Sequence, residues 1–516
     1  MGDTGKILSA AVAVTVAGAA IVSGTPWGSA SARGPDGMAL MAQEVSTGAS
    51  TAAATAYGQA GAPACTGVAI GVAQEAQSVI ARYPAGTAFC FSAGVHRVTR
   101  TINPGAGTSL GSSAGAVLTG SRRLSTWAAN SGDWKATGVL PAAYGLTGQC
   151  EDNVANICYL REQIFQDGIH LRRVATRALV VPGTFYGDYA ANAVYVGTNP
   201  GTHAMEISRT NTAISSSAAN VKVRGLAIEH FASASQAGAV MAGPGWQVQY
   251  NDIRDNHAVG VMLVNADNAM LGMNFIRRNG QLGAGQYSTV NGRITENYVN
   301  NNNTDGYWIA DWESGGIKTT WSNGGSVTNN QIWANLGVGL WSDAYDDTRT
   351  FSGNHIENNA ACGIRFEIGR NGVIASNTVI RNGYGTHRAS GTSLWDGAGI
   401  NVNTSSNVQV RSNYIAGNVN GVSVQSRTRG SGPWGLNVLR DVLVSNNTIS
   451  MRAGTQATGM VQNGGSLLPA GELVFKYNAY LVESLTAKHF QRFGTWSTST
   501  TWPKTGNDVG STYKVM

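Results

Sequence analysis

The chain of 516 residues has a formal net charge of +6, 67 glycines and only 12% charged residues. This composition is poor for helices and favours many short strands and turns. Lysine and arginine are scattered rather than clustered, which excludes nucleic acid as an expected partner and favours a mildly basic, solvated surface.

The N-terminus has the pattern of a targeting segment. Lys6 precedes the apolar run ILSAAVAVTVAGAAIVSG, and small-residue cleavage sites follow near Ala30 or Ala32. We therefore expect a signal peptide over residues 1–32 and a secreted protein, with an uncleaved anchor as the alternative. Residues 33–64, rich in Ala, Ser, Thr and Gly, are expected to form a disordered leader. No later apolar run is long enough to span a membrane, so no membrane partner is expected after cleavage.

The cysteines fit an oxidising compartment. Cys65 with Cys90, and Cys150 with Cys158, are close in sequence and are suited to disulfide bonds, which leaves Cys362 over. The spacings do not suggest a zinc site.

A helix is expected near the start of the folded region. The segment VAQEAQSVIARYPAG, which begins at Val72, has helical spacing and stops at Pro84. A stacked solenoid needs capped ends, so this segment predicts an N-terminal helical cap.

A repeat runs through the middle of the chain. The pattern Asn-x-Ile or Asn-x-Val returns about every 23 residues, with longer steps where about 10–13 residues are inserted, and a Gly-apolar strand follows in most units. The first Asn of each unit is Asn251, Asn274, Asn297, Asn330, Asn354, Asn377, Asn413 or Asn447. Several units carry a second Asn five residues later. Such Asn residues can form amide ladders along a stack or occupy left-handed turn positions.

Stacking of the units predicts an all-β parallel β-helix. A unit of about 23 residues cannot bury its own apolar face, whereas strands paired in parallel with the next coil can. The β-helix domain, with its cap, is expected over residues 65–466. Residues 467–516 break the repeat and are expected to pack as a tail on the last coils. The chain resembles the right-handed parallel β-helix superfamily, the pectate-lyase-like proteins, and the right hand is implied by that resemblance.

Two successive coils end their strands on an acid. The stretch GLWSD ends at Asp343 and GIRFE ends at Glu367, both at the same position after the Asn of their unit. Neighbouring strands lie about 4.7–4.9 Å apart, so the two carboxyl groups are expected about 5 Å apart. Two carboxylates so close should raise one pKa, and this separation is that of a retaining glycosidase.

Further ionisable and aromatic residues gather around this pair. Lys318, Trp341 and Arg365 occupy equivalent positions of three successive coils. Insertions at about 303–316, 384–397 and 426–436 frame the face, and the first brings Asp311, Trp312 and Glu313 near it. We expect Lys318 and Arg365 to bind substrate or tune the charges of the acids. Glu313 is expected to bind substrate and, with Asp311, to be a backup acid. Trp312, Trp341 and Trp395 are expected to stack on sugar rings.

The two motifs resemble the β-helix glycoside hydrolases of the β-xylosidase type. That resemblance implies that Asp343 is the nucleophile and Glu367 the general acid/base of a carbohydrate-active enzyme, a retaining glycoside hydrolase without a cofactor. The substrate would be a polysaccharide or oligosaccharide, and the protein is expected to be a monomer.

Two alternatives stay open. A polysaccharide lyase would use Lys318 or Arg365 to abstract a proton next to a uronate, with Asp343, Asp346, Asp347 or Glu367 holding Ca²⁺. A non-catalytic carbohydrate-binding solenoid would bind sugars without cleaving them.

Overall fold

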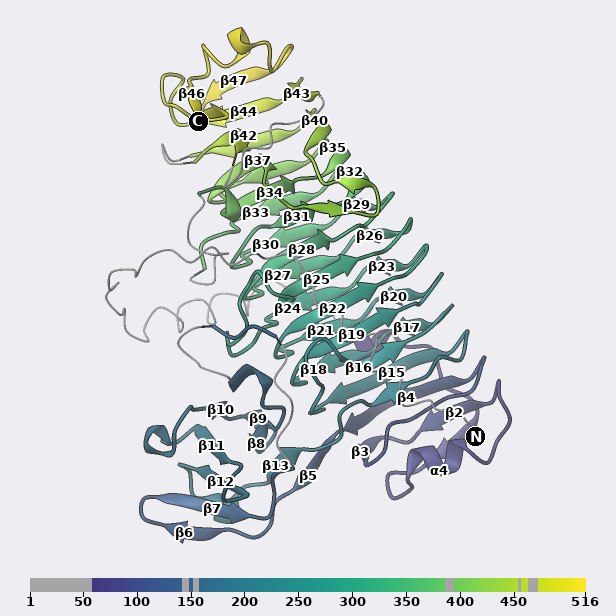
Figure 1. Ribbon diagram of the computed structural model, residues 1–516. Coiled ribbons are helices and arrows are strands. Elements are labelled where there is room, and N and C mark those ends of the chain that lie inside the picture. The colour runs from purple at the N-terminus through teal and green to yellow at the C-terminus, as the bar shows by residue number, and fades with distance from the viewer. Residues whose placement is uncertain (1–57, 142–147, 152–156, 386–393, 453–455, 463–471) are drawn as a thin grey trace.

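The computed structural model describes residues 58–141, 148–151, 157–385, 394–452, 456–462 and 472–516. The expected signal peptide and most of the expected leader lie outside these residues. Within this described part, no helix is long and apolar enough to cross a membrane. Strands stack along one axis from the N-terminal end to the C-terminal end (Figure 1).

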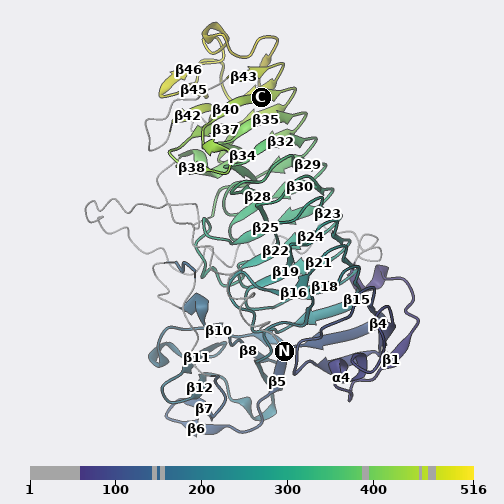
Figure 2. The same cartoon turned by 45° about the vertical axis from the view of Figure 1, so that its right-hand side comes forward.

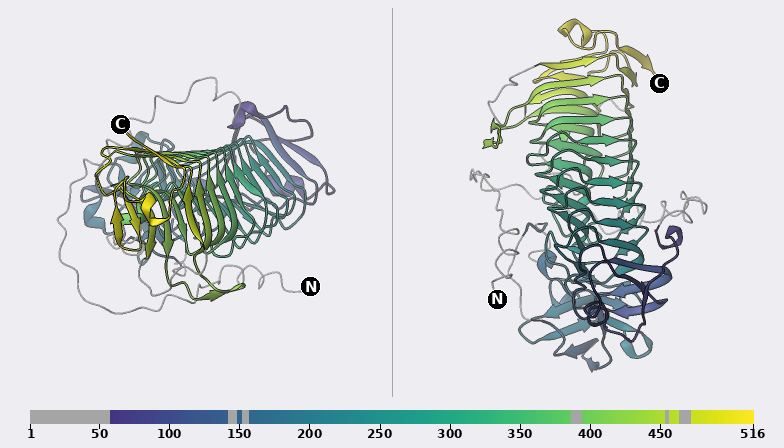
Figure 3. Two further views of the ribbon diagram at one scale, coloured as in Figure 1. Left: turned by 90° about the horizontal axis from the view of Figure 1, so that it is seen from above. Right: turned by 90° about the vertical axis from the view of Figure 1, so that its right-hand side faces the viewer.

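Each coil contributes one strand to each of three faces, and strands of the same face pair in parallel from coil to coil. Figure 3 shows these ladders from the side and from above. Face one contains β17 (Gln247–Gln249), β20 (Met270–Gly272), β23 (Arg293–Thr295), β26 (Ser326–Thr328), β29 (Thr350–Ser352), β32 (Arg370–Ala375), β35 (Ser406–Arg411), β40 (Arg440–Ser445) and β43 (Leu473–Lys476). Face two contains β18 (Asp252–Arg254), β21 (Phe275–Arg277), β24 (Tyr298–Asn300), β27 (Gln331–Trp333), β30 (His355–Glu357), β33 (Thr378–Ile380), β36 (Tyr414–Ala416), β41 (Thr448–Met451), β44 (Ala479–Val482) and β47 (Thr512–Val515).

Face three carries the motifs singled out in the sequence. It contains β14 (Ile214–Ser215), β16 (Gly238–Ala242), β19 (Val259–Val264), β22 (Leu282–Tyr287), β25 (Gly315–Thr320), β28 (Val338–Asp343), β31 (Ile364–Glu367), β34 (Ala398–Asn403), β37 (Asn420–Ser426), β42 (Thr458–Gln462) and β45 (Phe490–Arg492). Its inward residues stack in register, as in Ile317, Leu340 and Ile364, all of which are fully buried. This alternation leaves every second residue of a strand pointing away from the core.

The regular spacing of asparagine produces two buried ladders, one at the bend between face one and face two and the other at the bend between face two and face three. The Asn330 amide donates to Asn354 Oδ1, to Ile294 O and to Thr328 O, each at 3.0 Å, and accepts from Asn297 Nδ2. The ladder residues satisfy the polar groups of each bend, which stabilises it. The left-handed position is taken by the residue just before each ladder Asn, as at Asn329 with φ 57°.

The N-terminal end differs from the expected helical cap. From residue 58 on, the only α-helix of this end is α4 (Ala76–Ile80), a single turn whose Ala76, Val79 and Ile80 join the main core. The rest of this end is built from β1 (Val68–Ile70), β2 (Ala88–Phe91), β3 (Gly94–Arg97), β4 (Ser109–Thr119) and β15 (Lys222–Glu229). The expected cap is therefore not supported, because strands rather than a helix cover most of the apolar end.

A lobe interrupts the solenoid between β4 and β14. One small sheet contains β5 (Ser121–Arg123), β8 (Ile164–Gln166), β9 (Ile169–His170) and β13 (Met205–Ser208). The other contains β6 (Ala128–Asn130), β7 (Asp133–Thr137), β10 (Arg172–Arg173), β11 (Thr184–Asp188) and β12 (Ala193–Val196). The lobe has its own buried cluster and lies beside the early coils (Figures 1 and 2). The sequence predicts one β-helix domain that includes this stretch. The lobe contains no repeat, so no pattern in the sequence marks it as a separate part of the fold.

The C-terminal end also differs in its boundary. Strands β43, β44 and β47 continue the parallel ladders, so the coils run past residue 466, where the sequence predicts their end. β45 and β46 (Thr495–Ser497) form a hairpin, and the buried Phe490 and Trp502 stack beside Phe475 and Tyr480 at the end of the core.

Candidate active site

Asp343 and Glu367 stand at equivalent positions of adjacent face-three strands. The register pairs Trp341 with Arg365 and Ser342 with Phe366, so the next residues along are Asp343 and Glu367. Both are the last residue of their strand, and both lie on the side away from the core. The register thus puts the two acids one rung apart, at the strand spacing of about 4.8 Å.

The chain bends sharply directly after each acid. Ala344 and Tyr345 have φ 30° and 72°, and Ile368 has φ 50°. A β-branched residue in the left-handed region is an outlier that costs on the order of 1–3 kcal/mol. The bends hold both carboxyl groups at the same corner of the solenoid.

Lys318 is the main partner of Asp343. Its Nζ lies 2.8 Å from Asp343 Oδ2 and 2.5 Å from Glu313 Oε1, and the lysine is buried. Burial works against the charge on Asp343, but the ammonium of Lys318 and its hydrogen bond outweigh burial and hold the pKa of the Asp343 carboxyl below its usual range. Burial likewise opposes the charge on Lys318, and the carboxylates of Asp343 and Glu313 raise the pKa of this lysine.

Glu367 has a cationic partner that the sequence did not reveal. Its carboxylate forms an ion pair with Arg429 and accepts a hydrogen bond of 3.2 Å from Asn403 Nδ2, and Glu367 is only 2% exposed. Burial lowers the pKa of Arg429. The expected repulsion between two lone carboxylates is therefore relieved, because Lys318 and Arg429 each bring a positive charge beside one acid. Asn403 ends GINVN, which repeats the GIRFE pattern, whereas Arg429 lies in an insertion without a repeat.

Trp341 has no open ring face for a sugar. It is 3% exposed, with Lys318 Nζ 3.7 Å and Arg365 Cζ 5.1 Å from its ring centroid. Arg365 in turn donates from Nη1 to Asp311 Oδ1 at 2.5 Å. Trp341 thus acts as a buried spacer between two cations, which corrects the expectation of a stacking surface.

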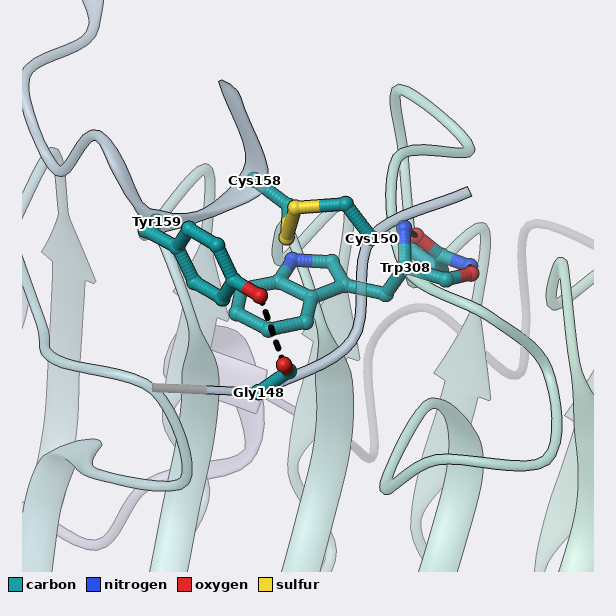
Figure 4. The surroundings of a disulfide bond; sticks show 6 residues. Gly148, Cys150, Cys158, Tyr159 and Trp308 are labelled. Atoms are coloured by element: carbon teal, nitrogen blue, oxygen red, sulfur yellow. Dashed lines mark hydrogen bonds between the residues drawn. A yellow bond between two sulfur atoms is a disulfide. The ribbon is translucent and has the colours of Figure 1, made fainter. Parts of the chain in front are cut away.

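The loop that carries Asp311 and Glu313 is braced by the lobe. Cys150 and Cys158 form one disulfide bond, which lies against Trp308 (Figure 4). Tyr159 donates to Gly148 O at 2.6 Å, and its ring meets Trp308 edge-on. Trp312 stacks on Trp308 at 5.6 Å between centroids, so its contact is with this brace. Cys65 and Cys90 form a second disulfide near the N-terminal end, and the buried thiol of Cys362 accepts a hydrogen bond from Arg365 Nη2 at 3.9 Å.

Other predicted residues lie away from the acid pair. Trp395, in η7 (Leu394–Gly397), is 5% exposed and stacks on Trp496 beside Ala457 and Val461. Asp346 is fully buried inside the solenoid, where burial raises its pKa and Thr319 and Ser342 donate to it.

Asp347 is the remaining acid of the expected calcium group. It binds Arg370 by Nε and Nη2 on the outside of the solenoid. Among the described residues, no group of three or more His, Cys, Asp or Glu is placed to hold a metal ion.

Exposed aromatic rings lie next to Asp343 instead. Trp321 follows Thr320, which pairs with Asp343, and is 41% exposed. Tyr345 contacts Trp321 at 4.6 Å and Trp434 at 5.8 Å between centroids, and Trp434 is 38% exposed. These rings, from two bends and from the hairpin of β38 (Ser431–Gly432) and β39 (Gly435–Leu436), form an aromatic border beside the acids.

Comparisons with known proteins support the fold. Residues 237–395 match the family model described as a right handed beta helix region, so the coils are assigned a right hand. No curated protein sequence matches the chain.

Solved structures with this architecture share little sequence with the chain. The complex of XylC with xylose is 14% identical over 79% of this chain and 80% of that chain, with a TM-score of 0.59. The A-module of the mannuronan C-5 epimerase AlgE6 from Azotobacter vinelandii is 11% identical over 85% and 93% of the two chains, with a TM-score of 0.47. The GH87 α-1,3-glucanase from Streptomyces thermodiastaticus strain HF3-3 is 13% identical over 86% and 72%, with a TM-score of 0.46.

Proposed function

We propose that this protein is a secreted, retaining glycoside hydrolase that acts on a polysaccharide or oligosaccharide. The observation that carries the proposal is the placement of Asp343 and Glu367 one rung apart at a corner bordered by exposed aromatic rings. A separation of about 5–5.5 Å between carboxyl groups suits a nucleophile and an acid/base. The similarity to a solved complex with xylose is in keeping with a sugar substrate.

Asp343 is the better nucleophile. Its lowered pKa keeps the carboxylate charged at pH values at which an ordinary aspartic acid is protonated. Attack on an anomeric carbon requires this charged form. A carboxylate oxygen of Asp343 bonds to that carbon while the glycosidic C–O bond breaks. Glu367 gives its proton to the leaving oxygen, then takes a proton from the water that releases the sugar from Asp343.

Glu367 must leave its ion pair to act as an acid. Arg429 belongs to the insertion after β37, not to the ladder of face three. Substrate that enters beside Glu367 would displace Arg429 and so free the carboxyl group of Glu367 to carry the proton. The ring faces of Trp321 and Tyr345 pack on the apolar side of a sugar.

The geometry disfavours the lyase. A lysine that abstracts a proton must be neutral, but two carboxylates raise the pKa of Lys318. Arg365 is equally unsuited, because it is buried against Asp311 and a guanidinium keeps its proton. Secretion agrees with the two disulfide bonds, which persist in oxidising compartments.

The test is release of reducing ends from a panel of polysaccharides. Asp343→Asn and Glu367→Gln should each lower turnover at least about 10³-fold while circular dichroism stays unchanged. Glu357→Gln is the matched control, because it removes a carboxylate from face two of the same coil. Turnover like that of the unaltered protein in either site variant would refute the assignment. Release of an unsaturated sugar would point to the lyase, and binding without cleavage to the non-catalytic solenoid.

A further inference from the structure

A cavity lies at the bend after face three, under the hairpin of β38 and β39. It has a volume of about 140 Å³. Its polar lining comes from Arg370, Thr404, Ser406, Asn437 and Arg440, and Trp434 provides an aromatic wall.

The lining of the cavity begins next to the candidate active site in the chain. Ile368 and Gly369, which line it, are the two residues that follow Glu367. Trp434 also contacts Tyr345, two residues after Asp343. A polymer bound at the acid pair would therefore place a neighbouring sugar unit in this cavity.

The charged side chains that line the cavity are positive. Two guanidinium groups line it and no carboxylate does. Arg370 is held by Asp347 on one side and by the Trp434 ring, 4.1 Å from its Cζ, on the other. Arg440 is half exposed and forms an ion pair with the exposed Asp441, whose Oδ2 lies 3.6 Å from Arg440 Nε, beyond hydrogen-bond distance.

The hairpin segment adds to this positive charge. Besides Arg440, the stretch from Arg427 to Val438 carries Arg427 and Arg429, of which Arg429 is paired with Glu367, and it has no acidic residue. Guanidinium groups match carboxylates in geometry and charge, hydroxyl and amide groups bind sugar hydroxyls, and an indole packs on a sugar ring. This combination selects a sugar that carries a carboxylate.

We propose that the cavity is a subsite for a uronate unit, so that the substrate is an acidic polysaccharide or one with uronate side groups. The proposal rests on the glycoside hydrolase function above for its account of the neighbouring bond. Arg440 binds the carboxylate, Arg370 adds positive charge, and Trp434 packs on the ring.

The test is a titration calorimetry comparison of methyl β-D-glucuronide with methyl β-D-glucoside, two probes that differ in the carboxylate. The full chain should bind the glucuronide about tenfold more tightly, since a hydrogen bond to a charged group is worth that much. The preference should shrink as salt is added. Arg440→Gln should remove the preference for the glucuronide, so that the two probes bind about equally. Trp434→Ala should weaken binding of both probes.

Arg411→Gln is the matched control, because it removes the same charge from an exposed position of β35 outside the cavity. It should keep the preference, and so should Asp343→Asn, because binding does not need turnover. Equal affinity for the two probes, or an unchanged preference in Arg440→Gln, would overturn the subsite. Absence of cleavage by the unaltered protein, with the preference intact, would instead refute only the hydrolase.

Discussion

Replacement of Lys318 by Met tests whether the charges of the site are truly buried. Lys318 is 3% exposed and is shared by Asp343, at 2.8 Å, and Glu313, at 2.5 Å. At about 4 Å between charges and an effective dielectric of about 20, one such pair is worth about 4 kcal/mol. Removal of one partner of a buried pair costs about 3–5 kcal/mol, because the other charge is left without compensation. We therefore expect Lys318→Met to lower the free energy of unfolding by that amount at neutral pH.

The pH dependence gives the sharper signature. The pKa of Asp343 in the folded protein lies below its unfolded value of about 3.9, so this residue adds stability above that pH, and the gain is lost as pH falls through the folded pKa. The pKa of Lys318 is raised, so its contribution is present below about 10.4 and is lost as pH rises beyond the folded pKa. The penalty of Lys318→Met should thus be largest between about pH 4 and pH 10 and shrink on further acidification.

Urea unfolding followed by circular dichroism measures both effects. Lys222→Met, at an exposed position of β15, is the control and should change stability by less than about 0.5 kcal/mol. Adding Glu313→Gln to Lys318→Met should restore part of the loss, because one fewer carboxylate then lacks its cation. A penalty below about 1 kcal/mol that does not vary with pH would refute a desolvated ion pair at this site.

Three further outcomes are expected. Asn330→Ala removes a buried amide that donates three hydrogen bonds, so the free energy of unfolding should fall by about 3–5 kcal/mol in urea titrations; a change below about 1 kcal/mol would contradict the ladder's role. Joint replacement of Cys150 and Cys158 by Ser should lower kcat about tenfold or more, because the loop that this disulfide braces positions Glu313. The far-UV circular dichroism spectrum should stay unchanged. An unchanged kcat would show that the disulfide is not needed to position the loop. Trp321→Ala should raise KM about 5–10-fold and leave kcat nearly unchanged, and an unaltered KM would exclude this ring from substrate binding.

The repeat in the sequence predicts the solenoid because one short period fixes both the strand pairing and the inward columns. Counting from Asn330 and Asn354 places Asp343 and Glu367 in the same register, and the strand pairing agrees. Such a prediction compares only neighbouring coils, so it needs only the number of residues between one repeat and the next. The lobe between β4 and β14 could not be predicted in this way, because strands such as β7 and β12 pair across a long stretch of chain without any repeat.

The environment of the acids could be predicted only in part. Outward alternation suggests solvent exposure for Trp341, yet Lys318 and Arg365 cover both sides of the ring, and Arg365 is in turn held by Asp311 of the loop before β25. Arg429 reaches Glu367 from the insertion after β37, whose path no pattern in the sequence determines. Insertions thus decide which charges surround a motif that the repeat itself positions.

The stereochemistry of hydrolysis tests the pairing of Asp343 with Glu367 most directly. Proton NMR of the first sugar released, recorded before mutarotation, reports the configuration at the anomeric carbon. Acids on adjacent rungs leave room for a covalent sugar on Asp343 but not for a water between them, so the product should keep the configuration of the substrate. A product of inverted configuration would contradict the account, because it requires carboxyl groups roughly 6.5–9.5 Å apart.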